Sequence, residues 1–290
     1  MTAMFGRSRA AAPPGTESAR PTLELSGPAL TTSLETLVSG TDEQGGIERY
    51  VDGLKYKAAL FAEALAEGRA VRLDEESFKG LCAFMAPVRR RIGTRLAEDG
   101  FPKVREAVVE LLDGAADTTT ADARIRRFCT RFPDDRKHRW VRDLAAEVLH
   151  NTYPELYPLM CRWVWDAKAN SGVLREIWHG ENVDHLVIDI SDTYETFLVL
   201  REELSGFVTD NGVFREVPFY VDLLCAQIYA GYISSQGGSY LRTDFSSPED
   251  PMQYTRRLLG LDGIDASSGR TRFKTVDGTA HVLEDIKLLD

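Results

Sequence analysis

The sequence predicts a mainly α-helical, bundle-like protein of about ten helices, with a small β-hairpin at its C-terminal end. Two observations lead to this fold class. From Ile47 to Gly260, apolar residues recur at intervals of three and four positions, which places them on one face of a helix. The segments between these apolar runs are short, and short connections favour antiparallel packing of successive helices.

At 290 residues, with 43% hydrophobic and 28% charged residues, the chain is large enough to bury a sizeable core. Its cysteines form no C-x-x-C pair, which argues against a cysteine zinc site or a disulfide framework. No apolar run reaches the roughly 20 residues needed to cross a bilayer. Residues 1–20 lack the hydrophobic segment of a secretory signal. We therefore expect a cytoplasmic protein without a membrane span.

Three regions are expected along the chain. Residues 1–42 are rich in Ala, Pro, Ser, Thr and Gly and lack a sustained apolar stripe, so we expect a disordered leader. An organelle transit peptide is the alternative interpretation of this composition. Residues 43–265 should form the helical domain. Residues 266–290 should form a β-hairpin packed on that domain, because Asp277-Gly278 separates two β-favouring runs.

The expected helices have recognisable end signals. A first helix is expected over 47–67, a second over 75–99 behind an N-cap at Asp74, and a third over 102–113, with Pro102 in its first turn. Loops that contain glycine, proline or asparagine separate the later helices. These are expected over 120–131, 135–150, 155–169, 172–180 and 184–207, from Pro218 to beyond Ile228, and from Ser247 to Gly260.

Two E-x-x-H patterns give the most specific chemical hypothesis: Glu147-Val-Leu-His150 and Glu176-Ile-Trp-His179. Residues three apart share one face of a helix, so each pattern presents a carboxylate and an imidazole together. Helix-bundle proteins that bind two iron or manganese ions use such pairs on different helices. The four residues are therefore candidate metal ligands. The competing interpretation places both histidines in the last turn of a helix, where they interact with the helix dipole.

A second pattern is the basic strip, residues 124–142, in a chain whose net formal charge is −10. The strip has eight basic residues and two acidic ones. Guanidinium groups bind phosphate and carboxylate through paired hydrogen bonds. The candidate anion- or partner-binding residues are Arg124, Arg127, Arg131, Arg136, Arg139 and Arg142. The alternative is a solvated face that pairs with acidic residues elsewhere in the protein.

These patterns favour a binding or accessory function, in which the basic strip and an aromatic-rich surface engage an anionic ligand or a protein partner. The aromatic residues concerned are Tyr153, Tyr157, Trp163, Trp165, Trp178 and Tyr194, for which core packing is the alternative. The strip does not exclude a nucleic acid partner. The alternative function is a carboxylate-bridged di-metal oxidoreductase that uses iron or manganese at the E-x-x-H pairs. No catalytic residue is assigned, since the chain lacks G-x-S-x-G, H-E-x-x-H and dinucleotide-binding patterns.

Overall fold

The computed structural model describes residues 20–42, 45–180, 186–235 and 252–263. Within these ranges the protein is mainly helical, with eleven α-helices and no β-strand longer than an isolated bridge. The mainly α-helical fold class is therefore confirmed. The predicted hairpin at residues 266–290 lies outside the described residues.

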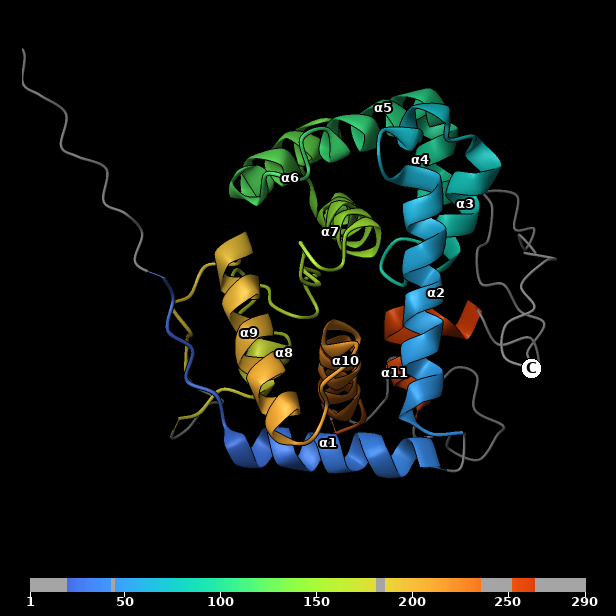
Figure 1. Ribbon diagram of the computed structural model, residues 1–290. Coiled ribbons are helices and arrows are strands. Elements are labelled where there is room, and N and C mark those ends of the chain that lie inside the picture. Colours follow the sequence, from blue (N-terminus) through green and yellow to red (C-terminus); the bar gives the residue numbers. More distant parts are fainter. Residues whose placement is uncertain (1–19, 43–44, 181–185, 236–251, 264–290) are drawn as a thin grey trace, which may run out of the picture.

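Helix α7 (Trp140–Thr152) lies at the centre of one half of the molecule (Figure 1). All of its residues except Arg142 are buried, although several of them are polar or charged. α2 (Ile47–Leu65), α5 (Phe101–Leu112) and α6 (Ala121–Thr130) pack around it. The polar groups that α7 buries must therefore find partners within the protein.

Helix α10 (Val217–Ser235) is the centre of the other half. α1 (Gly27–Asp42) runs across the lower end of the molecule in Figure 1, and α8 (Val173–Glu176), α9 (Tyr194–Asp210) and α11 (Gln253–Leu259) also pack on α10. α2 contacts both α7 and α10 and so joins the two halves. In the described ranges, no helix combines the length and the apolar character that crossing a membrane requires.

The predicted second helix is in fact two helices, α3 (Glu75–Ala83) and α4 (Ile92–Asp99). The predicted N-cap is confirmed, because the Asp74 carboxylate accepts a backbone hydrogen bond from the residue three positions later at 2.8 Å. Pro87 accounts for the break, since it has no N–H and disfavours a helical conformation in the residue before it. Residues 84–91 form a turn instead.

Helix α1 contradicts the prediction of a disordered N-terminal leader, because Gly27–Asp42 are helical. Leu30 and Leu37 are buried and Leu34 packs beside them, which gives α1 an apolar stripe at i, i+4 and i+7. Serines and threonines lie between these leucines, and their modest helix propensity hides the stripe in the sequence. Packing on α10 outweighs that propensity. Residues 1–19 lie outside the described part of the chain.

The prediction of a helix over 155–169 is wrong, because this segment forms turns between α7 and α8. Pro154 and Pro158 each remove a backbone donor and interrupt helical geometry. Most of the segment is nevertheless buried, so its backbone groups must be paired inside the protein. The start of α8 provides part of this pairing, since the Val173 N–H donates to the Trp163 carbonyl oxygen at 3.1 Å.

The helices expected over 172–180 and 184–207 are α8 and α9, and both are shorter than predicted. Gly172 precedes α8 with a φ of 123°, a conformation that favours glycine. A Cβ atom at this position would lie 2.7 Å from the Val164 carbonyl oxygen, so the backbone can approach only without a side chain. The start of α8 is thereby fixed against residues 155–169, which we call the buried turn segment.

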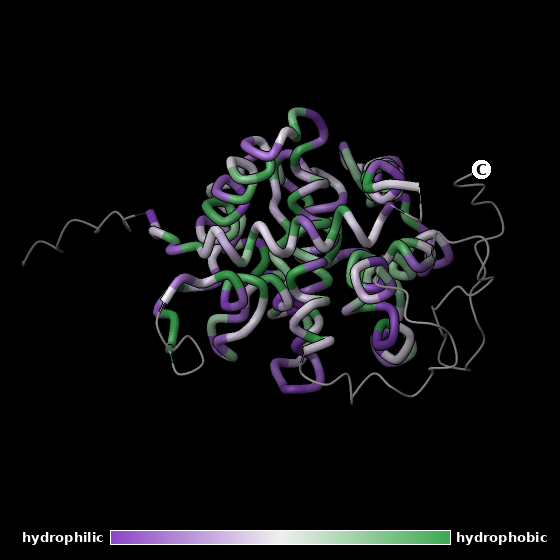
Figure 2. The backbone as a smooth tube through the Cα atoms, turned by 90° about the horizontal axis from the view of Figure 1, so that it is seen from below, coloured by the Kyte–Doolittle hydropathy of each residue, from purple (hydrophilic) through white to green (hydrophobic). Residues whose placement is uncertain are grey.

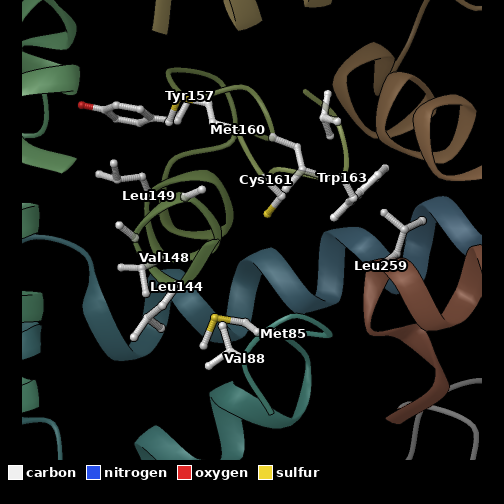
Figure 3. Close-up of a cluster of buried hydrophobic side chains, with 14 of the residues drawn as sticks. Met85, Val88, Leu144, Val148, Leu149, Tyr157, Met160, Cys161, Trp163 and Leu259 are labelled. Atoms are coloured by element: carbon white, nitrogen blue, oxygen red, sulfur yellow. The ribbon is translucent and has the colours of Figure 1, made fainter. Parts of the chain in front are cut away.

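Polar and apolar residues alternate along the helices in Figure 2, as expected for elements that bury one face. A single cluster of buried hydrophobic residues extends through both halves of the molecule. Figure 3 shows part of it, where Met85 and Val88 of the 84–91 turn join Leu144 of α7. Cys161 and Trp163 of the buried turn segment belong to the same cluster.

Candidate functional site

Glu147 of the first E-x-x-H pair is buried and already has partners on α2 and on its own helix, α7. The Nζ of Lys57, on α2, donates to Glu147 Oε2 at 3.1 Å and to the carbonyl oxygen of Leu259, on α11, at 2.9 Å. The Nδ2 of Asn151 donates to the same carboxylate oxygen at 2.8 Å. Buried charges are tolerated when they are paired and hydrogen-bonded, and this carboxylate meets both conditions.

His150 of the same pair is buried between α7 and α10. Its Nδ1 lies 2.8 Å from the Tyr157 carbonyl oxygen, and its Nε2 lies 3.0 Å from Asp222 Oδ2. Both neighbours are acceptors, so both ring nitrogens donate when His150 is a cation beside an ionised Asp222. Burial lowers the pKa of His150, but Asp222, the Tyr157 carbonyl and Glu147 together raise it above its ordinary value.

The second E-x-x-H pair lies elsewhere. Glu176 is the last residue of α8, and His179 follows it in an exposed position, where its backbone N–H donates to the Glu24 carbonyl oxygen at 2.7 Å. Among the residues that the structure describes, no group of three or more His, Cys, Asp or Glu side chains could hold a metal ion. The two pairs are therefore not brought together. His179 also lies outside any helix, so a helix-dipole role does not apply to it.

Arg124 does not belong to an exposed basic surface. Its side chain is 5% exposed and points into the protein, where its guanidinium binds the hydroxyl of Tyr157. It also donates to the carbonyl oxygens of Leu111, Asp113 and Asp117, at 3.5, 3.4 and 3.1 Å. These carbonyls lie at and just beyond the C-terminal end of α5, where helix geometry leaves acceptors unpaired. Arg124 therefore stabilises the fold.

The remaining arginines of the basic strip face different surroundings. Arg131 pairs with Glu106 and Glu110 of α5, and Arg142 pairs with Asp192 at 3.1 Å. Arg127 and Arg136 are exposed and have no ion pair within the described ranges. Of the six candidate arginines, only Arg139 lines the cleft between the two halves of the molecule. The basic strip is therefore not one continuous binding surface.

This cleft has a volume of about 490 Å³. It lies where the 84–91 turn, the start of α7 and the buried turn segment meet α10 and α11. Its charged and aromatic lining residues are Arg89, Arg90, Arg139, Arg162 and Arg257, Asp143 and Asp166, and Trp163, Tyr229 and Tyr254. Five arginines and two aspartates line the cleft, so guanidinium groups outnumber carboxylates there.

Two aspartates fix two of these arginines in place. Arg162 donates through Nε and Nη2 to Asp143 Oδ2, at 3.0 and 2.6 Å, while its backbone N–H binds the other carboxylate oxygen at 2.9 Å. Arg139 Nη2 donates to Asp166 Oδ2 at 2.6 Å. Burial raises the pKa of Asp143, and the charge and hydrogen bonds of Arg162 oppose that rise. The four side chains form an ordered row of alternating charge.

Arg89 and Arg90 are neighbours with different roles. Arg89 is 1% exposed and makes a two-point ion pair with Asp262, at 2.5 and 3.0 Å, so it joins the turn to the residues after α11. Arg90 is exposed, and its side chain has no hydrogen bond or ion pair with the described residues. Arg90 is therefore a cationic group of the cleft that is available to a ligand.

Gly260 positions α11 against the same turn. It adopts a left-handed conformation, with a φ of 74°, that favours glycine. A Cβ atom here would lie 1.8 Å from the Phe84 carbonyl oxygen. Only a glycine therefore lets α11 carry Tyr254 and Leu258 to the cleft.

Aromatic side chains form the less polar part of the cleft. The rings of Trp163 and Tyr229 have centroids 5.8 Å apart and are tilted by 39°. Trp163 is 8% exposed, and its Nε1–H is buried away from the cleft, with no hydrogen-bond acceptor among the described residues. Tyr254 is half-buried, with no ring contact and no hydrogen bond to its hydroxyl from any described residue. Tyr254 is thus the aromatic residue with contacts to offer in the described part of the cleft.

No family model, curated protein or solved structure matches this chain. What defines the protein is an all-helical fold in its described part, with an arginine-rich cleft between its two halves. Among the lining residues, the sequence pointed to Arg139 and, as part of an aromatic-rich surface, to Trp163, but not to Arg90 or Arg162. The three arginines are separated by long stretches of sequence, and no short motif links them.

Proposed function

We propose that the protein is a non-catalytic binding protein that holds a small anionic ligand in the cleft between α7, α10 and α11. The observation that carries this proposal is Arg90, a cleft arginine without a protein partner in the described residues, in a lining where guanidinium groups outnumber carboxylates. The volume of about 490 Å³ falls within the range of roughly 300–1,000 Å³ that is usual for small-molecule sites.

The fixed positions of Arg139 and Arg162 support the proposal. A guanidinium has five N–H donors, and the aspartates occupy only some of those on each arginine. Because Asp143 and Asp166 already hold these side chains in place, a ligand would not have to immobilise them. An anion between Arg90, Arg139 and Arg162 would complete the row of alternating charge.

The proposal is tested by calorimetric titration of the full chain with inorganic phosphate. We expect saturable binding that weakens at least about tenfold in Arg90→Ala, since a hydrogen bond to a charged group contributes about 1.5–3 kcal/mol. Arg127→Ala is the matched control, because Arg127 is an exposed arginine of the basic strip that does not line the cleft. Absence of binding, or an equal loss in both variants, would contradict the proposal.

A further inference from the structure

We infer that the ligand is a phosphate monoester that carries a flat aromatic ring, as a nucleoside monophosphate does. This inference rests on the proposed function and specifies the class of anion. It combines three features of the cleft: its guanidinium groups, its volume and the unused contacts of Tyr254.

The cationic groups of the cleft favour an anion with several acceptor oxygens. Arg90 has no ion pair with the described residues, and Arg139 and Arg162 keep N–H donors that their aspartates do not occupy. A phosphate monoester carries a charge of about −1.5 to −2 at pH 7 and has three acceptor oxygens. Arg90, Arg139 and Arg162 offer matching donors. A single carboxylate would neutralise less of this charge and would offer fewer acceptors.

A phosphate group alone would neither fill the cleft nor cover its apolar lining. Inorganic phosphate would occupy only a part of a 490 Å³ cleft and would leave its apolar side unfilled. That side is contributed mainly by α10 and α11, through Tyr229, Ile233, Tyr254 and Leu258. A flat ring attached to the phosphate would cover these side chains and bury apolar surface.

Tyr254 has contacts to offer to such a ring. Its ring is half-buried and makes no ring contact among the described residues, so one of its faces can stack on a ligand ring. A nucleobase is a flat ring of the size that such stacking covers.

The experiment compares adenosine monophosphate, ribose 5-phosphate, adenosine and inorganic phosphate by calorimetry on the full chain. The expected order is adenosine monophosphate at least tenfold tighter than ribose 5-phosphate and phosphate, with adenosine weaker than its monophosphate. Tyr254→Leu should remove the preference for the ring-bearing phosphate and leave the affinity for ribose 5-phosphate unchanged. Tyr220→Leu is the matched control, a half-buried tyrosine of α10 that does not line the cleft.

The two proposals fail in different ways. Equal affinity for phosphate, ribose 5-phosphate and adenosine monophosphate would overturn the ring inference and leave anion binding standing. Binding of adenosine as tight as that of adenosine monophosphate would overturn the assignment of a phosphate. If none of the phosphates binds, both the inference and the proposed function are wrong.

Discussion

At the scale of single residues, the buried ionisable side chains are held by partners that determine their charge. Lys57 and Glu147 form a buried ion pair at 3.1 Å, and His150 lies between the Tyr157 carbonyl and Asp222. Removing one member of a buried pair leaves an uncompensated charge, which is far more destabilising than losing an exposed pair. The E-x-x-H residues of α7 are therefore explained by the packing of the fold.

We predict that the His150–Asp222 pair makes stability depend on pH. The pKa of His150 is raised in the folded protein, so its protonation stabilises the fold fully below the unfolded pKa of about 6.5. That contribution is lost as the pH rises through the folded pKa. Asp222→Asn keeps an oxygen acceptor but removes the negative charge, and should therefore lower the free energy of unfolding more at pH 6 than at pH 9.

Urea unfolding of the wild type and of Asp222→Asn at the two pH values measures this difference. His179→Gln is the control, because His179 is exposed, and its pH profile should follow the wild type. An Asp222→Asn effect of the same size at both pH values would mean that His150 is not the group that titrates.

The residues of the candidate site were only partly predictable from the sequence. Arg139 lies in a dense basic run, and its charge pattern pointed to an anion. Arg90 and Arg162 come from segments far apart in the chain that the fold brings together. Arg124 has the same side chain as Arg139 but is buried against carbonyl oxygens, and no local pattern distinguishes the two.

At the scale of secondary-structure elements, predictions succeeded where local signals agreed with the tertiary structure. α2 and α5 follow the predicted apolar stripes, and the Asp74 cap begins α3 as expected. The prediction failed for residues 155–169, where apolar side chains recur but the segment is buried as turns. Periodicity records that a residue is buried, and it does not distinguish a buried turn from a helix.

Helix α1 provides the prediction that belongs to this scale. Leu37 is fully buried on the face of α1 that joins the core, while the next residue, Val38, is 46% exposed. Leu37→Ala should lower the free energy of unfolding by about 2–5 kcal/mol, the usual range for a buried leucine. Val38→Ala should change it by about 0.5 kcal/mol or less, as surface substitutions usually do. Thermal or urea unfolding of the two variants tests this contrast, and equal effects would show that α1 does not dock as described.

At the scale of the whole molecule, the distribution of charge separates the cleft from its surroundings. The chain carries a net charge of −10, yet guanidinium groups outnumber carboxylates in the cleft lining. Charge of one sign concentrated in a cleft focuses the local potential and raises the local concentration of oppositely charged ligands. The acidic remainder of the protein disfavours general adhesion to polyanions, so the cleft is expected to select small anions.

The fold class could be predicted because helical periodicity is repeated along most of the chain. The cleft could not, because it depends on how the 84–91 turn, α7 and α11 meet in space. Gly260 and Pro87 show the difficulty: one allows a close approach to Phe84 and the other breaks a helix. Both are ordinary residues in the sequence, and their effect becomes clear only from the packing around them.

A crystal structure of the protein with adenosine monophosphate is the most direct test of the proposed binding site. We expect the phosphate to lie within hydrogen-bond distance of Arg90, Arg139 and Arg162, with the base against Tyr254. In such a complex, the ion pairs of Arg162 with Asp143 and of Arg139 with Asp166 should be unchanged. A phosphate bound instead at the exposed Arg127 or Arg136, with the cleft holding only solvent, would contradict the account.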